Sequence, residues 1–199
     1  MKHFLLSLLV FLSGICGFTS CDSMIASSLE GTWEGEMYFA SYYDGRYYYS
    51  NYTEIEFVGD PYRFKSGRGY WIDHYSGAPW DYVANHFTWQ VRDKIIYIHF
   101  IEDDQYLEIR HYDLDDDCFS GDVYYEGEDR YFELFHTSSP NWDEYDYGYG
   151  YYGGGYYGGY YSQRRSAEWT DADTTDRRVP AGIEKLKERP RRVLTGEQK

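Results

Sequence analysis

The sequence predicts an all-β fold over residues 31–137, an antiparallel up-and-down barrel of about eight strands. Between Gly31 and His136, apolar and polar side chains alternate with a period of two, as in strands that bury one face. Turn-forming residues interrupt this alternation at intervals of roughly 8–12 residues, which is typical of all-β domains. No stretch of this region repeats its apolar residues with helical spacing.

The chain begins with the features of an export signal. Lys2 precedes an apolar run from Phe4 to Leu12, a layout typical of a secretory signal peptide. The run is shorter than the about 20 apolar residues that a membrane-spanning helix needs. We therefore expect residues 1–20 to be a signal peptide and residues 21–30 to be a tether.

The end of this signal resembles the lipobox of bacterial lipoproteins. The segment 18–21 reads Phe-Thr-Ser-Cys, with phenylalanine at a position where leucine is commoner. The resemblance implies cleavage before Cys21, diacylglycerol on its thiol and an acyl chain such as palmitate on the new amino group. Several chains matter because one myristoyl chain gives only marginal membrane binding. The alternative is ordinary secretion, with Cys21 incidental.

The cysteine count fits this interpretation. Of Cys16, Cys21 and Cys118, only Cys118 would remain as a free thiol, so the mature protein would contain no internal disulfide and must rely on core burial. Cys118 follows two aspartates, and this negative setting raises a thiol pKa. We interpret it as structural or incidental.

The predicted strands follow one another as hairpins. Thr32–Ser41 alternates and ends before Asp44-Gly45, a strong two-residue hairpin signal. Later strands are centred on residues 53–57, 62–72, 86–91, 96–100, 107–110, 119–125 and 132–134. The residues expected to point inward are large and apolar: Trp33, Met37, Phe39, Ile55, Phe57, Phe64, Phe87, Trp89, Val91, Ile96, Ile98, Phe100, Leu107, Ile109, Val123, Phe132 and Leu134. Their bulk leaves open whether the barrel encloses a cavity.

Closure of the sheet removes its two unpaired edges. Gly31-Thr32-Trp33 opens the first strand and resembles the Gly-x-Trp signature of lipocalins, in which the tryptophan plugs the closed end of the barrel. The resemblance covers about residues 30–137 and implies a lipocalin-like barrel; the later lipocalin motifs are not evident. The alternatives are that Trp33 is an ordinary core aromatic, or that the strands form an open β-sandwich.

Charge narrows the class of partners. The formal net charge is −15, of which residues 1–163 carry −18 and residues 164–199 carry +3. An acidic domain argues against nucleic acid as a partner and against flat adhesion to anionic lipid headgroups. Contact with a membrane is therefore expected through the N-terminal lipid alone.

One aromatic group points to binding. Aromatic rings beside Asp73 and Asp81 suit sugar rings or cationic ligands, and these rings belong to Trp71, Tyr75, Trp80 and Tyr82. The alternative is a loop that packs on its own aromatic side chains.

Other chemistry has little support in the sequence. The acidic run Asp113–Asp117 lacks the order of a calcium loop, and the histidines are scattered. Neither a Gly-x-Ser-x-Gly elbow nor a phosphate loop is present. We expect no enzyme activity, no cofactor and no metal.

The C-terminal third differs from the body. Residues 138–162 are rich in tyrosine and glycine, and residues 163–199 are polar and mildly basic. Both segments are expected to be disordered, with a brief helix over residues 182–189 and a weak electrostatic contact of the basic tail with the acidic barrel.

Taken together, the sequence predicts a lipid-anchored, non-catalytic binding protein of the bacterial cell envelope, for which we favour the outer membrane. The expected ligand is a small apolar or sugar-like molecule, or an envelope protein. The alternative is a structural protein that associates through its Tyr/Gly-rich segment.

Overall fold

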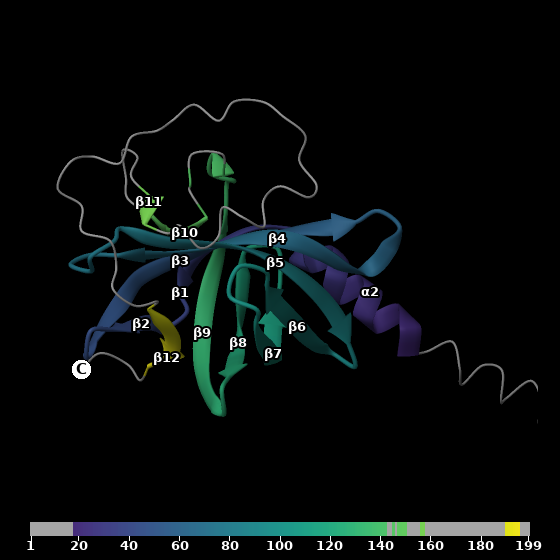
Figure 1. Ribbon diagram of the computed structural model, residues 1–199. Helices are drawn as coiled ribbons and strands as arrows, with labels where there is room; N and C mark the ends of the chain where they lie inside the picture. The colour runs from purple at the N-terminus through teal and green to yellow at the C-terminus, as the bar shows by residue number, and fades with distance from the viewer. Residues whose placement is uncertain (1–17, 143–144, 146, 151–155, 158–189, 196–199) are drawn as a thin grey trace, which may run out of the picture.

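The computed structural model shows a closed antiparallel β-barrel with one helix against it (Figure 1). It describes residues 18–142, 145, 147–150, 156–157 and 190–195. In chain order the elements are α2 (Phe18–Leu29), β1 (Gly31–Glu36), β2 (Phe39–Tyr43), β3 (Arg46–Asp60), β4 (Arg63–Tyr75), β5 (Tyr82–Arg92), β6 (Ile95–Phe100), β7 (Gln105–Leu114), β8 (Cys118–Tyr125), β9 (Glu128–Thr137), β10 (Gly148–Gly150), β11 (Tyr156–Tyr157) and β12 (Arg191–Leu194). Among these residues, no helix is both long enough and apolar enough to traverse a bilayer.

Eight strands close the barrel. Neighbouring strands pair in the order β3, β4, β5, β6, β7, β8, β9, β1, and β1 pairs back to β3, all antiparallel. The predicted up-and-down barrel is confirmed, and the open sandwich is excluded. The architecture is consistent with a lipocalin-like fold.

The first predicted strand is broken in two. β1 and β2 are separated at Met37 and Tyr38, and Tyr38 has a positive φ of 55°. The fifteen-residue β3 pairs with β2 through its first half and with β1 through its second half. Because of this break, β2 pairs with β3 on one side and with β12 on the other, at one end of the barrel.

The tight turns follow the predicted chemistry. Asp44 and Gly45 both have positive φ, 47° and 75°, and join β2 to β3. Two-residue loops with this backbone match the twist of the strands. Asp93 and Lys94 join β5 to β6 in the same conformation, with φ of 54° and 61°.

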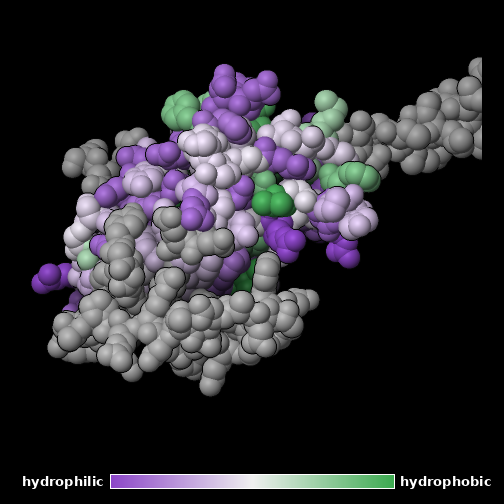
Figure 2. All heavy atoms as spheres, turned by 90° about the horizontal axis from the view of Figure 1, so that it is seen from above, coloured by the Kyte–Doolittle hydropathy of each residue, from purple (hydrophilic) through white to green (hydrophobic). Residues whose placement is uncertain are grey.

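Aromatic side chains fill the barrel. Phe57 and Phe87 lie with ring centroids 5.3 Å apart and Trp71 and Phe100 5.2 Å apart, each in edge-to-face contact. All the residues predicted to point inward are buried except Phe64, which is 76% exposed. On the face seen from above, the described residues at the surface are mostly hydrophilic or intermediate in hydropathy (Figure 2).

Phe64 corrects the predicted inward set. The register between β3 and β4 slips at Gly59 and Asp60, so residues 64–66 have no partner on β3. Strict alternation does not hold across such an irregularity. The side chain therefore points away from the core at the tip of the hairpin.

Helix α2 covers one end of the barrel, where the sequence predicted a tether over residues 21–30. Ala26 and Leu29 join the core, and the Trp33 indole Nε1 donates to the Leu29 carbonyl at 2.9 Å. Asp22 accepts from Lys65 Nζ and from the Lys94 backbone N, each at 3.2 Å. The helix is thus fixed to the barrel along its length rather than tethered loosely.

Three short strands lie in the segments for which disorder was predicted. β10 pairs with the start of β5 and with β11, and β12 pairs with β2. Glycine permits the pairing of β10 with β5, because a Cβ on Gly150 would lie 2.1 Å from Cζ of Tyr82. For residues 148–150, 156–157 and 190–195, the prediction of disorder is therefore corrected; the predicted helix over residues 182–189 lies outside the described residues.

Candidate binding site at the mouth of the barrel

The end of the barrel opposite α2 is crossed by β12 (Figure 1). Here the chain turns between β4 and β5, between β6 and β7, and between β8 and β9, whereas α2 lies at the other set of turns. β12 pairs antiparallel with β2, placing Arg192 opposite Ser41 and Leu194 opposite Phe39. We call this end the mouth.

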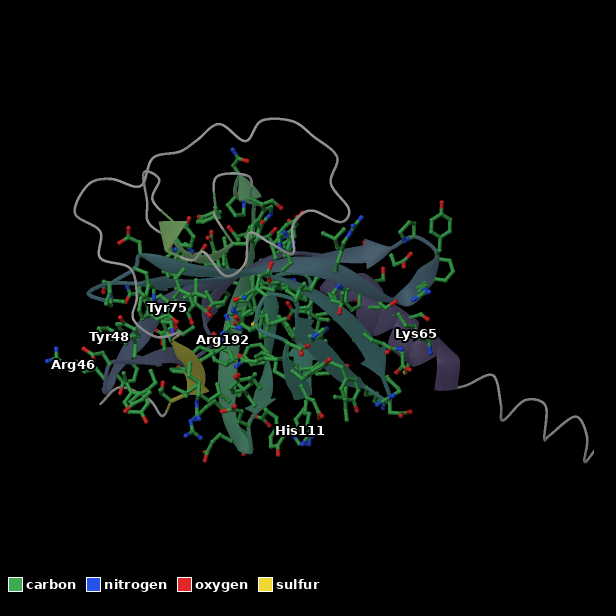
Figure 3. The ribbon with its side chains drawn as sticks, in the orientation of Figure 1. Arg46, Tyr48, Lys65, Tyr75, His111 and Arg192 are labelled. Atoms are coloured by element: carbon green, nitrogen blue, oxygen red, sulfur yellow. The ribbon has the colours of Figure 1, made fainter. Side chains whose placement is uncertain are left out.

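Arg192 points from β12 into the mouth, next to Tyr75 (Figure 3). Its Nη2 donates to Asp73 Oδ2 at 3.1 Å and to Asn85 Oδ1 at 2.6 Å. Asp73 and Asn85 are both 0% exposed and Arg192 is 3% exposed. The adjacent strands β4 and β5 thus present two oxygen acceptors to one buried guanidinium, an arrangement we call the Asp73–Asn85 cradle.

The cradle is held in place by its own hydrogen bonds. Asp73 Oδ1 accepts from Thr53 Oγ1 at 2.7 Å and from the Trp71 indole at 2.9 Å. These bonds leave Oδ2 directed at Arg192. Since a buried carboxylate is costly without such partners, its charge is stabilised by the barrel wall as well as by the cation.

Aromatic rings complete the pocket around the guanidinium. The Arg192 Cζ lies 4.1 Å from the centroid of Phe100 and 5.5 Å from that of Phe39. Planar guanidinium groups stack well on aromatic faces, and such contacts strengthen when water is excluded. The guanidinium therefore lies between two hydrogen-bond acceptors and two aromatic rings.

The electrostatics of the mouth favour the charged form of the arginine. Burial lowers the pKa of Arg192, but the charges of Asp73 and Asp103 outweigh burial and raise it overall. Asp103 Oδ2 lies 3.9 Å from Arg192 Nη1. Burial and the Asp73 charge raise the pKa of Tyr75 well above its usual value, so Tyr75 stays neutral and donates or accepts in its bond with Ser41.

We expect alkali to loosen the mouth. Burial raises the pKa of Tyr125 to about 12, and an exposed tyrosine ionises near 10. A raised pKa means that the associated stability is complete below about pH 10 and is lost as pH rises through 12. Absorbance at 295 nm should show late-ionising tyrosines, with a falling melting temperature over the same range.

The control for this titration is Tyr125→Phe, which should remove part of the late absorbance step. A melting temperature that stays constant from pH 9 to 12 would contradict the prediction.

The backbone of residues 190–195 is gripped as well. Tyr149 donates its hydroxyl to the Pro190 carbonyl at 3.0 Å and Tyr125 donates to the Arg192 carbonyl at 3.4 Å. Arg130 Nε donates to the Thr195 carbonyl at 2.9 Å. These three side chains come from β8, β9 and β10, so the segment is held from the barrel side along its whole length.

The four predicted ligand-binding residues divide between the mouth and its surroundings. Trp71 donates to Asp73 of the cradle, and Tyr75 lies at the mouth, where its hydroxyl bonds to Ser41. Trp80 packs against Tyr75 and Tyr149 beside the mouth, and Tyr82 lies on the outer face of β5 against Tyr145. All four are buried.

Several residues of the site were not predicted. Asn85, Phe39 and Phe100 look like ordinary strand residues in the sequence, and Arg192 lies in a segment without alternation. Asp73 was noticed only as a companion of the aromatic group. Its inward position between Trp71 and Tyr75 is the signal that could have identified it, because an acid on a buried face needs a partner.

Cys118 and the acidic run beside it serve the local turn. Burial, followed by the charges of Glu133, Asp115 and Asp113, raises the pKa of the Cys118 thiol, in agreement with the sequence-based prediction. Asp115 Oδ1 accepts from the backbone N of Asp117 and Cys118, and these bonds lower the pKa of its carboxyl. Within the described part of the chain, no group of three His, Cys, Asp or Glu side chains could hold a metal ion.

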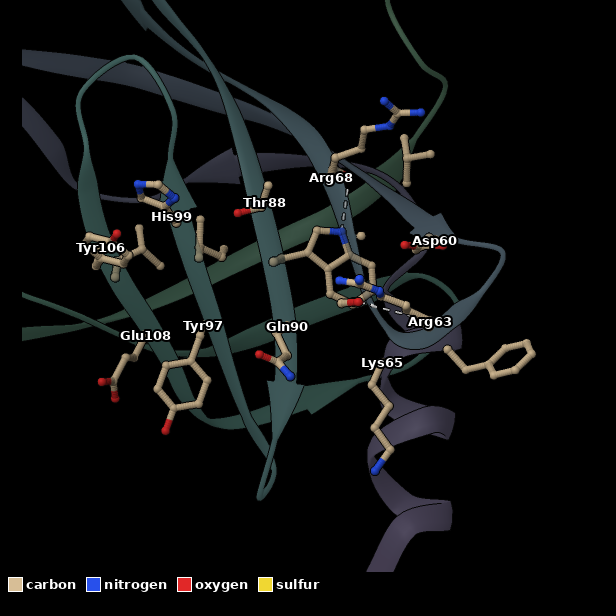
Figure 4. A pocket seen from close by; sticks show the side chains of 18 of the residues that line it. Asp60, Arg63, Lys65, Arg68, Thr88, Gln90, Tyr97, His99, Tyr106 and Glu108 are labelled. Carbon is tan, nitrogen blue, oxygen red and sulfur yellow. Dashed lines mark hydrogen bonds between the residues drawn. The ribbon is translucent and has the colours of Figure 1, made fainter.

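A second hollow lies on the outer face of the barrel (Figure 4). This groove, with a volume of about 1240 Å³, runs from the β3–β4 hairpin across β5 to β7. Its lining includes Lys65, Arg68, Tyr97, Tyr106 and Glu108. It is wide and open, and it presents no buried polar group comparable to the Asp73–Asn85 cradle.

The chain was compared with protein-family models, curated proteins and solved structures. No family model matches the chain, and neither the search of curated proteins nor the search of solved structures found a match.

Proposed function

We propose that this chain is a lipid-anchored, non-catalytic binding protein of the bacterial cell envelope whose barrel mouth binds a cationic group of its ligand. The observation that carries the proposal is the buried Asp73–Asn85 cradle, which already holds a guanidinium. A barrel fold is compatible with a binding protein, and the mouth supplies the chemistry for one class of ligand.

The geometry favours a guanidinium over an ammonium ion. Asp73 and Asn85 both accept from one guanidinium nitrogen, Nη2, and the Phe100 ring centroid lies 4.1 Å from Cζ. A guanidinium is planar and weakly hydrated, so it suits such a pocket better than a compact, strongly hydrated ammonium ion. The apolar interior is filled by aromatic side chains, which gives less support to the apolar or sugar-like ligands predicted from the sequence.

Both oxygens of Asp73 are occupied by fixed donors. They accept hydrogen bonds from Thr53, Trp71 and Arg192. In this arrangement the carboxylate has no oxygen left for a reacting group. This supports the non-catalytic part of the proposal.

The position of Cys21 supports the anchored part. Cys21 is exposed on α2, at the end of the barrel opposite the mouth. Cleavage before Cys21 would retain Asp22, Ala26 and Leu29, the residues of the helix that are buried against the barrel. An acylated Cys21 would therefore place the mouth away from the bilayer, toward ligands in the envelope.

Association through the Tyr/Gly-rich segment is the weaker candidate. Tyr149 is 6% exposed and packs against Trp80, and its hydroxyl holds Pro190. Part of that segment therefore packs against the barrel and is not available for association with other molecules.

Guanidinium rescue tests the binding half of the proposal. In the full chain, Arg192→Ala empties the cradle, and millimolar methylguanidinium should raise its melting temperature by several degrees because a ligand that binds only the folded state stabilises it. Methylurea, which has a similar shape and no charge, should have no such effect.

Arg191→Ala is the matched control, since Arg191 is exposed and forms a surface ion pair with Glu126 at 3.5 Å. Equal responses of the two variants would refute the cationic site. The anchored half is tested separately, by mass analysis of Cys21 in protein extracted from membranes; a mature N-terminus without acyl mass would refute it.

A further inference from the structure

We infer that the mouth is a binding site for an extended peptide that carries an arginine and an aliphatic residue two positions later, added as a strand to β2. Residues 190–195 are the tethered occupant that fills this site in the present structure. The inference rests on the proposed function, because it names the ligand class that brings the guanidinium to the cradle.

The first observation that supports a peptide site is that β2 can accept an added strand. β2 has β3 on one side and β12 on the other, so without β12 its second edge would be free for another strand. The Thr195 backbone N also donates to the Tyr38 carbonyl at 2.9 Å, just beyond the strand. Main-chain bonding to a sheet edge gives affinity for extended peptides of many sequences.

The alternation of β12 defines the sequence preference. Arg192 enters the cradle, and Leu194, two residues later, packs against the barrel core. Arg191 lies on the other face, is exposed, and contacts Glu126. Side chains at alternate positions of an added strand are read by pockets, so the expected motif is arginine, any residue, aliphatic.

The remaining contacts would hold any peptide backbone. The hydroxyls of Tyr149 and Tyr125 and the guanidinium of Arg130 all donate to carbonyl oxygens of the segment. None of these three bonds depends on a side chain of residues 190–195. A different peptide with the same two anchoring side chains would therefore receive the same bonds.

The cradle also keeps unused hydrogen-bonding capacity. Within the described part of the chain, Asn85 Nδ2 is buried and has no hydrogen-bond partner. The tethered segment therefore satisfies the site incompletely. Charge complementarity favours a basic peptide, since residues 1–163 carry a net charge of −18.

The covalent connection between β10 and residues 190–195 determines how well an added peptide can compete with these residues for the mouth. Residues 151–189 join β10 to Pro190, and apart from β11 they lie outside the described residues. Because the segment is covalently attached to the barrel, it competes with an added peptide at a high effective concentration. An added peptide should therefore compete poorly with the intact chain and well once the connection is cut.

The experiment uses the full chain with a specific protease site inserted between Gly182 and Ile183, folded first and then cut. A fluorescent peptide with the sequence of residues 190–195 is added, and its anisotropy is followed to equilibrium. We expect the cut protein to bind it at least about tenfold more tightly than the uncut protein.

Two peptide variants provide the matched comparison. Replacing the residue equivalent to Arg192 by alanine should weaken binding at least about tenfold, since the peptide loses both charge-assisted hydrogen bonds to the cradle. Replacing the residue equivalent to Arg191 should change binding less than about threefold. Equal losses for the two variants would overturn the inference.

After cutting, the fragment that contains residues 190–195 could stay bound and block the site, so a second protein is needed as a control. Uncut full-length Arg192→Ala weakens the tethered strand and should bind the labelled peptide more tightly than the wild-type chain. Absence of peptide binding to both proteins would overturn strand addition. Stabilisation of Arg192→Ala by methylguanidinium in that same case would leave the proposed function standing, so the two failures are distinguishable.

Discussion

Replacing Asp73 with alanine should lower the free energy of unfolding by about 3–5 kcal/mol, the range for breaking a buried ion pair from one side. Three donors lose their acceptor at once: Arg192 Nη2, Thr53 Oγ1 and the Trp71 indole. If β12 dissociates from the mouth, water can solvate Arg192. The Thr53 hydroxyl and the Trp71 indole, however, remain buried in the barrel wall without an acceptor. Each unsatisfied buried group costs about 1–3 kcal/mol.

Urea unfolding of the full chain, followed by tryptophan fluorescence, measures this loss. Asp73→Asn keeps the shape and one acceptor oxygen and should fall between the wild type and Asp73→Ala. Asp129→Ala is the surface control, because Asp129 is exposed and surface substitutions usually change stability by less than about 0.5 kcal/mol. Equal stabilities of Asp73→Ala and Asp129→Ala would contradict the importance of the cradle.

Replacing Trp33 with alanine should cost about 3–5 kcal/mol, the usual range for truncating a buried aromatic residue. The indole is 1% exposed and makes edge-to-face contacts with Phe119 and His136, at centroid distances of 5.7 and 5.1 Å. It also satisfies the Leu29 carbonyl at the end of α2. The variant should therefore lose core packing and loosen the helix together.

Two measurements separate these effects. Urea unfolding gives the total loss, and hydrogen exchange of the α2 amides reports on the helix. Trp33→Phe keeps most of the ring and removes the hydrogen bond, so it should cost less in stability yet still accelerate exchange in α2. Unchanged exchange in both variants would show that Trp33 does not hold the helix.

The barrel could be predicted because its pattern is local. The alternation within each strand indicates which face points inward, and the turn at Asp44-Gly45 follows from residues that accept positive φ. Phe64 was assigned wrongly because alternation was continued through the register shift at Gly59 and Asp60. A bulge depends on the partner strand, which a single strand's pattern does not reveal.

The site could be predicted only in part for a related reason. Trp71, Tyr75 and Asp73 stand close together in the sequence, and their aromatic and acidic character is visible there. Arg192 lies 119 residues beyond Asp73, in a four-residue strand too short to show a period. Its pairing is decided by the break after β1, which frees an edge of β2, and by a buried carboxylate that needs a cation.

The placement of β12 has a consequence for the order in which the molecule assembles. The bond from Thr195 to the Tyr38 carbonyl joins residues 157 positions apart, whereas the barrel strands are complete by Thr137. A contact so distant in sequence forms late, because loop closure must precede it. Such late contacts slow unfolding more than they speed folding. During synthesis, the residues of the cradle would thus precede their own arginine, and residues 190–195 would pair with a barrel whose strands are already complete.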